Sequence, residues 1–232
     1  MRISEIYASL QGEGLLAGTP STFVRASGCN LRCVWCDTPF TSWEPTGDDL
    51  SPADVLARVD ALGQRHVVVT GGEPLLFADV AELCVALRRG GCHVTVETAG
   101  TVLPATSEPV ADLMSISPKL ASSTPPADTP QRWATRHAAS RRRDDVLRGL
   151  AAAGRHQFKF VIETEADLAE ACGWLDDLGL AVERGSVFLM PQARTADELA
   201  SRSAWLAREC RRLGFRLAPR HHITWFGNRR GT

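Results

Sequence analysis

Short apolar runs rich in valine, isoleucine and phenylalanine alternate with stretches of helical period along most of the chain. Each run is followed by glycine, proline or polar residues, which is typical of buried strands. Strands that alternate with amphipathic helices indicate βα units and a parallel sheet. The predicted strands are residues 22–26, 66–70, 93–98, 114–117, 158–162 and 186–190, with a weaker pattern at 215–219.

Four helices are predicted from their ends and their apolar faces. Ser51 is a typical N-cap, Pro52 suits the first helical turn, and Gly63 is a stop signal. Thr195 and Glu198 have the spacing of a capping box. The predicted helices are residues 51–63, 144–154, 165–179 and 195–214.

Residues 122–143 depart from this alternation. Proline, serine and threonine are frequent in the first half of the segment, and arginine in the second half. We interpret the segment as a surface excursion, because it is polar and too short to form a domain. The 232 residues suffice for one sizeable core. The sequence therefore predicts a single domain over residues 1–232, with the excursion at about 122–143.

The polar and glycine-rich motifs of the chain directly follow predicted strands. A doubly wound sheet and a partial barrel both place functional residues in loops at the carboxyl ends of parallel strands. The motifs are residues 28–38, 71–74, 99–101, 118–120 and 191–194. In either architecture we expect these motifs to meet at one edge of the sheet.

Composition and charge argue against several classes of protein. The 26 basic and 27 acidic residues give a formal charge of −1, which offers no bulk attraction to nucleic acid or to an anionic membrane. No apolar run approaches the ~20 residues of a spanning helix, and the first residues lack a signal-peptide core. We therefore expect a cytoplasmic protein. In that compartment seven cysteines favour metal binding or catalysis over a disulfide framework.

Cys29, Cys33 and Cys36 are close enough in sequence for a tight loop to direct all three sulfurs to one place. Structural zinc usually needs two close pairs of ligands, and the sequence offers no second pair. A 4Fe-4S cluster binds thiolates on separate irons, so three cysteines would leave one iron open. A redox-sensitive group of cysteines in a loop is the alternative interpretation.

The motif CNLRCVWC resembles the cysteine motif of the radical S-adenosylmethionine (SAM) superfamily, whose last gap commonly holds an aromatic residue such as Trp35. The resemblance implies that the open iron binds SAM and that reduction of the cluster cleaves SAM to a radical that abstracts hydrogen. TGGEP, residues 70–74, resembles the motif whose backbone and glutamate, here Glu73, hold the SAM amino group. Paired glycines allow close approach to a ligand, and a carboxylate suits an ammonium. Considered alone, these residues also form ordinary turns.

A longer resemblance points to one family within this superfamily. The stretch EIYASLQGEGLLAGTPSTFVRASGCNLRCVWCDTPFT is similar to the 7-carboxy-7-deazaguanine synthase family, and VVVTGGEP, VETAGT, SISPKL, FKFVI and WFGNRRGT follow in the family's order. The resemblance implies an α/β fold, specifically a partial (β/α)6-type parallel barrel. It also implies a lyase that contracts 6-carboxy-5,6,7,8-tetrahydropterin to 7-carboxy-7-deazaguanine with loss of ammonia, in 7-deazapurine (queuosine-type) biosynthesis. A 4Fe-4S cluster, SAM, Mg²⁺, a flavodoxin or ferredoxin as electron donor, and a homodimer are further expectations.

The same resemblance assigns residues to substrate and metal. Arg25 is expected to bind the pterin carboxylate through two parallel hydrogen bonds, with a surface arginine at a strand end as the alternative. Thr38 matches the family's magnesium ligand, which suits an ion that keeps most of its waters. Its neighbour Asp37 is the alternative ligand and is otherwise expected to bind backbone amides. The substrate residues are Leu10, Gln11, Gly12, Arg25 and Thr70, and the metal ligands are Cys29, Cys33, Cys36 and Thr38.

The remaining family positions concern SAM and proton transfer. Glu97, His221 and His222 are candidates for proton handling, because carboxylates and imidazoles shuttle protons near neutral pH. All three also suit purely structural roles. The positions expected to bind SAM are Gly72, Glu73, Ser117, Pro118, Lys119, Met190, Pro191, Gln192 and Ala193.

Two other functions remain open from the sequence. An activating enzyme for a glycyl-radical partner can have a similar cysteine motif, although LQGEG, Arg25 and SPKL argue against it. A non-catalytic iron-sulfur or zinc module is the second alternative. Iron analysis and SAM cleavage on reduction would separate these alternatives from the predicted catalyst.

Overall fold

The computed structural model of the chain describes residues 1–227 and 229–231. Within these residues a nine-stranded sheet has the order β3-β1-β2-β4-β5-β6-β7-β8-β9. All neighbours from β2 to β9 are parallel, whereas β1 is antiparallel to β2 and β3. The strands are β1 (Arg2–Leu10), β2 (Pro20–Ala26), β3 (Asp48–Asp49), β4 (His66–Gly71), β5 (His93–Thr98), β6 (Leu113–Ile116), β7 (His156–Ile162), β8 (Val187–Pro191) and β9 (Arg216–Leu217).

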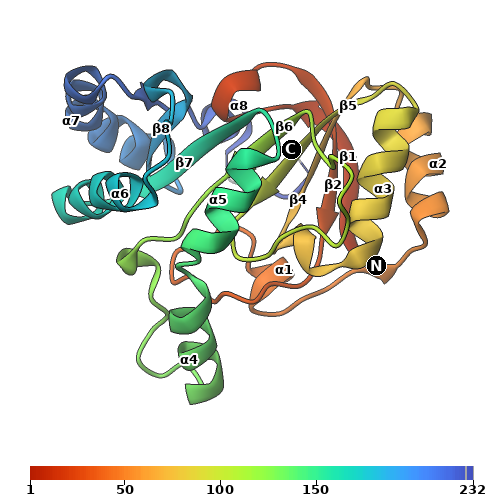
Figure 1. Cartoon of the computed structure of the whole chain (residues 1–232), viewed down its shortest axis with the longest axis horizontal. Coiled ribbons are helices and arrows are strands. Elements are labelled where there is room, and N and C mark those ends of the chain that lie inside the picture. The colour runs from red at the N-terminus through yellow and green to blue at the C-terminus, as the bar shows by residue number, and fades with distance from the viewer. Residues whose placement is uncertain (228, 232) are drawn as a thin grey trace.

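The longer helices cover the outer face of the curved sheet, as Figure 1 shows for α2, α3, α5, α6 and α7. The α-helices are α1 (Pro39–Ser42), α2 (Pro52–Leu62), α3 (Ala78–Arg89), α4 (Gln131–Ser140), α5 (Asp144–Ala152), α6 (Glu165–Leu178), α7 (Ala196–Leu213) and α8 (His221–Phe226). Short 3-10 helices are η1 (Gly14–Leu16), η2 (Pro74–Leu76), η3 (Ala121–Ser123) and η4 (Arg184–Ser186). In the described residues β3 and β9 are the two edges of the sheet, so the barrel is open. The predicted fold class, a partial parallel barrel, is confirmed.

The apolar runs that predicted the strands form the core between the sheet and its helices. Val67, Val68 and Val69 of β4 are all fully buried, as expected for a parallel strand covered on both faces. Trp174 of α6 is also buried and its ring lies 6.4 Å from that of Phe160 on β7, measured between centroids. Burial of such large side chains against the strands is the main stabilisation of the fold.

Helix ends follow the predicted capping signals. The helices α2, α6 and α7 each begin with a capping box and end at a glycine in the left-handed region. Their N-caps are Ser51, Thr164 and Thr195. No helix in the described part of the chain combines the length and apolarity that crossing a membrane requires.

The sequence analysis did not identify α4, which lies inside the segment 122–143. This helix projects from the barrel at the bottom of Figure 1. Its apolar pattern is weak because His137 is its buried side chain and Trp133 is only half-buried. The helix is polar on average, so it lacks the row of large apolar side chains by which the other helices were predicted.

Candidate active site

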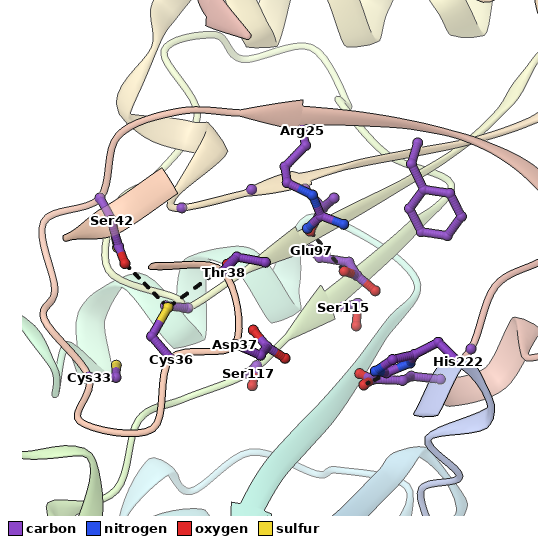
Figure 2. Close-up of a pocket in the computed structure, with 18 of the residues that line it drawn as sticks. Arg25, Cys33, Cys36, Asp37, Thr38, Ser42, Glu97, Ser115, Ser117 and His222 are labelled. Carbon is purple, nitrogen blue, oxygen red and sulfur yellow. Dashed lines mark hydrogen bonds and ion pairs between the residues drawn. The ribbon is translucent and has the colours of Figure 1, made fainter. Parts of the chain in front are cut away.

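The concave side of the sheet surrounds a cavity of about 480 Å³. Strands β1, β2 and β4 to β8 all place side chains on its wall, together with the cysteine loop, defined as residues 27–38. In Figure 2, Cys33 and Cys36 lie on one side of this space, His222 of α8 lies on the other, and Glu97 lies between them. Four of the five motifs that follow strands contribute to the lining, and residues 191–194 do not.

All three cysteines that were expected to hold the cluster line this cavity. The Cys36 amide donates to the Cys33 carbonyl at 3.2 Å, and the Leu31 amide donates to Cys29 Sγ at 3.4 Å. Cys36 Sγ also lies 3.2 Å from Ser42 Oγ. Contacts within one short stretch of chain therefore hold the three sulfurs on the same wall.

The chemistry of these donors fits a 4Fe-4S cluster. Burial raises the pKa of the Cys29 and Cys33 thiols to about 12, so both stay protonated near pH 7 unless iron replaces the proton. In residues 1–227 and 229–231, no three His, Cys, Asp or Glu side chains form a group that could hold one metal ion. A cluster does not require one, because each thiolate binds its own iron. Trp35 also lines the cavity, and its buried Nε1 has no acceptor among the described residues, so a bound group could accept from it.

The glycine motif after β4 is joined to the cysteine loop by the backbone. The Gly72 amide donates to the Ala26 carbonyl at 3.1 Å, and the Glu73 amide donates to the Gly28 carbonyl at 2.9 Å. Gly71 has a φ of 135°, in the region that favours glycine. A Cβ on Gly72 would lie only 2.2 Å from the Gly28 carbonyl oxygen. The two glycines therefore allow the loops to touch.

We expect Gly72→Ala to lower the free energy of unfolding by about 1–3 kcal/mol, the usual range for an overpacked site. The added methyl group would push the glycine motif away from the cysteine loop, because the obstructing atom is backbone. Thermal unfolding of the anaerobic holoenzyme measures the effect. Gly173→Ala is the matched control, because a Cβ at this helical position meets nothing within 4 Å. Equal melting temperatures for the two variants would contradict the prediction.

Glu73 does not line the cavity, although SAM was expected to contact it. Its fully buried carboxylate accepts from Thr98 Oγ1 at 2.8 Å and from the Ala99 amide at 2.9 Å. Burial raises the pKa of Glu73, and these hydrogen bonds oppose the shift. In this arrangement the carboxylate joins the ends of β4 and β5 behind the cavity wall.

Glu97 is the acidic group at the centre of the cavity wall. Gln11 Nε2 donates to its Oε1 at 3.1 Å, and Thr70 Oγ1 donates to its Oε2 at 2.9 Å. Lys159 Nζ lies 3.9 Å from Oε1. The side chain is 23% exposed, so a molecule in the cavity can reach it. Glu97 therefore contacts two residues, Gln11 and Thr70, that were expected to bind the substrate.

A second group of charges, which the sequence analysis did not identify, surrounds Glu13. Lys159 and Arg220 both form ion pairs with its carboxylate, and His222 Nδ1 lies 3.8 Å from it. Arg220 also donates to Asp37 Oδ2 at 2.8 Å. Asp37 therefore binds an arginine instead of the backbone amides expected from the sequence. This network connects the cysteine loop to β7 and to the start of α8.

Burial and the neighbouring charges together set the pKa values of Glu13, Lys159 and His222. Burial opposes the charge of Glu13, but the attraction of Lys159 and Arg220 outweighs it and holds the pKa of the carboxyl well below its usual range. Burial likewise opposes the charge of Lys159, but Glu13 and Glu97 hold its pKa well above its usual range. Burial lowers the pKa of His222, so this imidazole is neutral near pH 7.

Arg25 lies at the cavity wall with part of its guanidinium already engaged. Its Nε donates to Glu5 Oε1 at 2.6 Å, and its Nη2 donates to Tyr7 Oη at 2.8 Å. A guanidinium has five N–H donors, so others are available to a ligand in the cavity. Glu5 and Tyr7 keep the side chain in place.

The remaining predicted residues divide into two groups. Lining residues include Leu10, Gly12, Thr38, Gly72, Ser117, Lys119 and Met190, whereas Pro118, Pro191, Gln192, Ala193 and His221 lie outside the cavity. Lys119 Nζ donates to Ser117 Oγ at 2.8 Å. The ring of His221 stacks on the ring of Trp225 at a centroid distance of 4.5 Å. Trp225 is exposed, so His221 faces the surface and not the cavity.

Lys159 is the missed residue with a signal in the sequence. It stands between Phe158 and Phe160 in a strand that is otherwise apolar. A lysine is seldom buried without a partner, so such a position indicates an acidic neighbour. The identity of that neighbour, Glu13, depends on a contact across 146 positions of the chain.

The known sequences and structures that are similar to this chain agree with one another. The radical SAM superfamily model matches residues 23–165. A 7-carboxy-7-deazaguanine synthase from Rhodopirellula baltica is 44% identical over 99% of this chain and 88% of its own. One from Halobacterium salinarum is 45% identical over 95% of this chain and 88% of its own. A crystal structure of QueE from Escherichia coli superposes with a TM-score of 0.65 at 25% identity, covering 94% of this chain and 92% of that one.

Proposed function

The chain belongs to the 7-carboxy-7-deazaguanine synthase family of the radical SAM superfamily, and we propose that it contracts 6-carboxy-5,6,7,8-tetrahydropterin to 7-carboxy-7-deazaguanine with loss of ammonia. It is then a lyase of 7-deazapurine (queuosine-type) biosynthesis. The observation that supports this most directly is the cavity itself, because Cys29, Cys33 and Cys36 share it with Arg25 and Glu97. A non-catalytic iron-sulfur or zinc module would have no use for the arginine and glutamate in the same cavity.

Cys29, Cys33 and Cys36 would hold the 4Fe-4S cluster that the superfamily implies. With SAM bound, the cluster supplies the one-electron chemistry that removes a hydrogen atom from the substrate. Gly72, Ser117, Lys119 and Met190 are available to SAM because they line the cavity. Glu73, Pro118 and residues 191–193 do not line the cavity. They would act indirectly, by shaping the loops that carry the SAM-binding residues.

The substrate would lie between the cysteine loop and the Glu97 group. Arg25 would bind the pterin carboxylate with the donors that Glu5 and Tyr7 leave available. The wall also offers Leu10, Gln11, Gly12 and Thr70. Gly12 leaves room there, because a Cβ would lie 2.7 Å from His222 Nδ1. These contacts would orient the ring for hydrogen abstraction.

Proton transfer would fall to Glu97 and His222. Both line the cavity and both contact charged neighbours that can stabilise a changed protonation state. His222 is available as a proton acceptor near neutral pH, because burial keeps its imidazole uncharged. His221 lacks this access, and its expected catalytic role has no support from its position.

Thr38 would bind Mg²⁺ together with substrate oxygens. Thr38 lines the cavity, and its hydroxyl lies 3.9 Å from Cys36 Sγ, which would place the ion beside the cluster. We expect Thr38→Ala to raise the Mg²⁺ concentration for half-maximal activity at least about tenfold. Magnesium titrations of activity measure this. The control is Thr46→Ala, which removes an exposed hydroxyl outside the cavity. An unchanged magnesium dependence in Thr38→Ala would remove Thr38 from the site.

The electron donor and the oligomeric state complete the proposal. A flavodoxin or a ferredoxin would reduce the cluster, and two copies of the chain would form a homodimer. Light scattering during size-exclusion chromatography tests the second point, and a mass of about 25 kDa in place of twice that value would contradict it.

The assay for the function uses anaerobic enzyme with dithionite, SAM, Mg²⁺ and the carboxytetrahydropterin, followed by mass spectrometry. We expect 7-carboxy-7-deazaguanine and ammonia in equal amounts. Cleavage of SAM without conversion of the pterin would contradict the proposal. A glycyl-radical activating enzyme would leave the pterin unchanged and would install a radical only when a partner protein is added.

A further inference from the structure

We propose that the cysteine loop and α4 together form the docking surface for an acidic electron-carrier protein. The Arg–Trp face is defined as Val34, Arg132, Trp133 and Arg136, and the buried Arg32 lies beneath Trp133. The inference rests on the proposed function, because a protein partner that delivers electrons is needed only where a cluster is reduced during turnover. It adds where that partner binds and which chemistry recognises it.

The first observation is that α4 packs directly on the cysteine loop. The Arg32 amide donates to His137 Nδ1 of α4 at 3.1 Å, and the Val34 amide donates to the Ser123 carbonyl at 3.2 Å. Ser123 Oγ lies 3.2 Å from His137 Nε2, so the two contacts share a buried pair. The helix is therefore attached to the stretch between Cys29 and Cys36 and does not merely project beside it.

The second observation is a chain of contacts that leads from Trp133 through Arg32 to Cys29. The Arg32 guanidinium lies 3.5 Å from the centroid of the Trp133 ring and donates to the Cys29 carbonyl at 2.9 Å. Arg132 and Arg136 also lie over this ring, at 5.9 and 5.6 Å. Three guanidinium groups thus share one indole next to the predicted cluster.

The third observation is a local excess of positive charge on a nearly neutral chain. Residues 122–143 contain five arginines and one aspartate, against a formal charge of −1 for the whole protein. Three of these arginines form ion pairs at the far end of the segment, namely Arg141 with Glu170, Arg142 with Asp177 and Arg143 with Asp145. Among the described residues no carboxylate pairs with Arg132 or Arg136, and both are exposed.

The face has the composition of a small transient interface. Val34, between Cys33 and Cys36, is 45% exposed and adds an apolar side chain to the surface of the cysteine loop. Electron-transfer complexes are typically small and weak, and charge around the contact guides their association. None of the residues of this face lines the substrate cavity, so a partner here can approach the cluster while the cavity is occupied. An acidic protein surface is the complement of this face, whereas two exposed arginines are too few to follow a nucleic-acid backbone.

The test is the double charge reversal Arg132→Glu with Arg136→Glu in the anaerobic holoenzyme. The probes are a purified flavodoxin and a purified plant-type ferredoxin, and calorimetry measures the dissociation constant at low and high salt. We expect the reversal to weaken binding of the preferred carrier about tenfold or more and to reduce its salt dependence. Carrier-driven reduction of the cluster, followed by electron paramagnetic resonance, should slow by a similar factor.

Matched variants separate charge from folding. Arg132→Lys with Arg136→Lys retains the charge and should bind both carriers within about threefold of the parent protein. Arg89→Glu with Arg211→Glu reverses two exposed charges away from this face and should leave binding unchanged. Unchanged carrier binding in the Arg132/Arg136 reversal would overturn the proposal. So would a reversal that weakens binding of a transfer RNA but not of either carrier.

Dithionite distinguishes failure of this proposal from failure of the proposed function. This small reductant needs no docking surface, so the charge-reversed enzyme should convert the pterin with dithionite within about twofold of the parent rate. If the parent enzyme does not convert the pterin with dithionite, the proposed function is wrong, whatever the carriers bind. If the parent enzyme does convert the pterin, and the carriers bind the parent and the charge-reversed enzyme equally, only the proposed docking surface is wrong.

Discussion

Glu97→Gln is expected to lower turnover of the pterin by about 10²–10⁴-fold, the usual contribution of a positioned proton-transfer group. The amide keeps the size of the side chain and can still accept from Thr70, but it cannot take up a proton or balance the nearby charge of Lys159. SAM binding should remain within about threefold, because the lost charge acts in proton transfer and not in SAM recognition. Single-turnover product formation and SAM binding measure the two quantities separately.

Glu163→Gln provides the comparison for this variant. Glu163 also lies near a cation, 3.5 Å from Arg202 Nη2, but it is exposed and lies outside the cavity. The control should retain the parent turnover within about twofold. A Glu97→Gln enzyme that matches the control would exclude Glu97 from proton transfer and would leave the carboxylate with a structural role.

Lys159→Met is expected to produce the largest loss of stability, about 3–5 kcal/mol, which corresponds to roughly 6–20 °C in melting temperature. The reason is that Glu13 would lose one of the two cations that stabilise its buried charge. Thermal unfolding of the anaerobic holoenzyme near pH 7 is the measurement. Because the pKa of Glu13 is depressed in the fold, its contribution is present above its ordinary value of 4.5 and is lost as the pH falls below it.

Two further variants make this prediction specific. Lys159→Met combined with Glu13→Gln removes both charges and should recover a large part of the lost stability. Arg89→Met breaks a pair with Glu108 whose side chains are 72% and 54% exposed. Such a surface pair contributes at most about 1 kcal/mol, so its melting temperature should fall by less than about 4 °C. Equal effects of Arg89→Met and Lys159→Met would contradict the buried network.

Much of the fold followed from local patterns. The parallel strands were predicted because their apolar runs are buried on both faces, and α2 and α7 because Ser51 and Thr195 cap them. The two-residue strand β3 and the helix α4 were missed because β3 is too short and α4 is largely polar. The predicted ranges also did not include β1 and α3. The family resemblance supplied what these patterns lacked, namely the choice of a partial barrel over a doubly wound sheet.

The sequence by itself indicated the cofactor chemistry, because Cys29, Cys33 and Cys36 lie in one short loop and match the motif of a known superfamily. Only the tertiary structure decided which charges meet. Arg220 reaches Glu13 across 207 positions and Asp37 across 183, which depends on the order of the strands and not on local spacing. The same holds for Glu73, whose carboxylate turns behind the cavity because Thr98 at the end of β5 and the next residue, Ala99, provide its donors there. Side-chain direction at a strand end is set by such neighbours, and they are distant in the sequence.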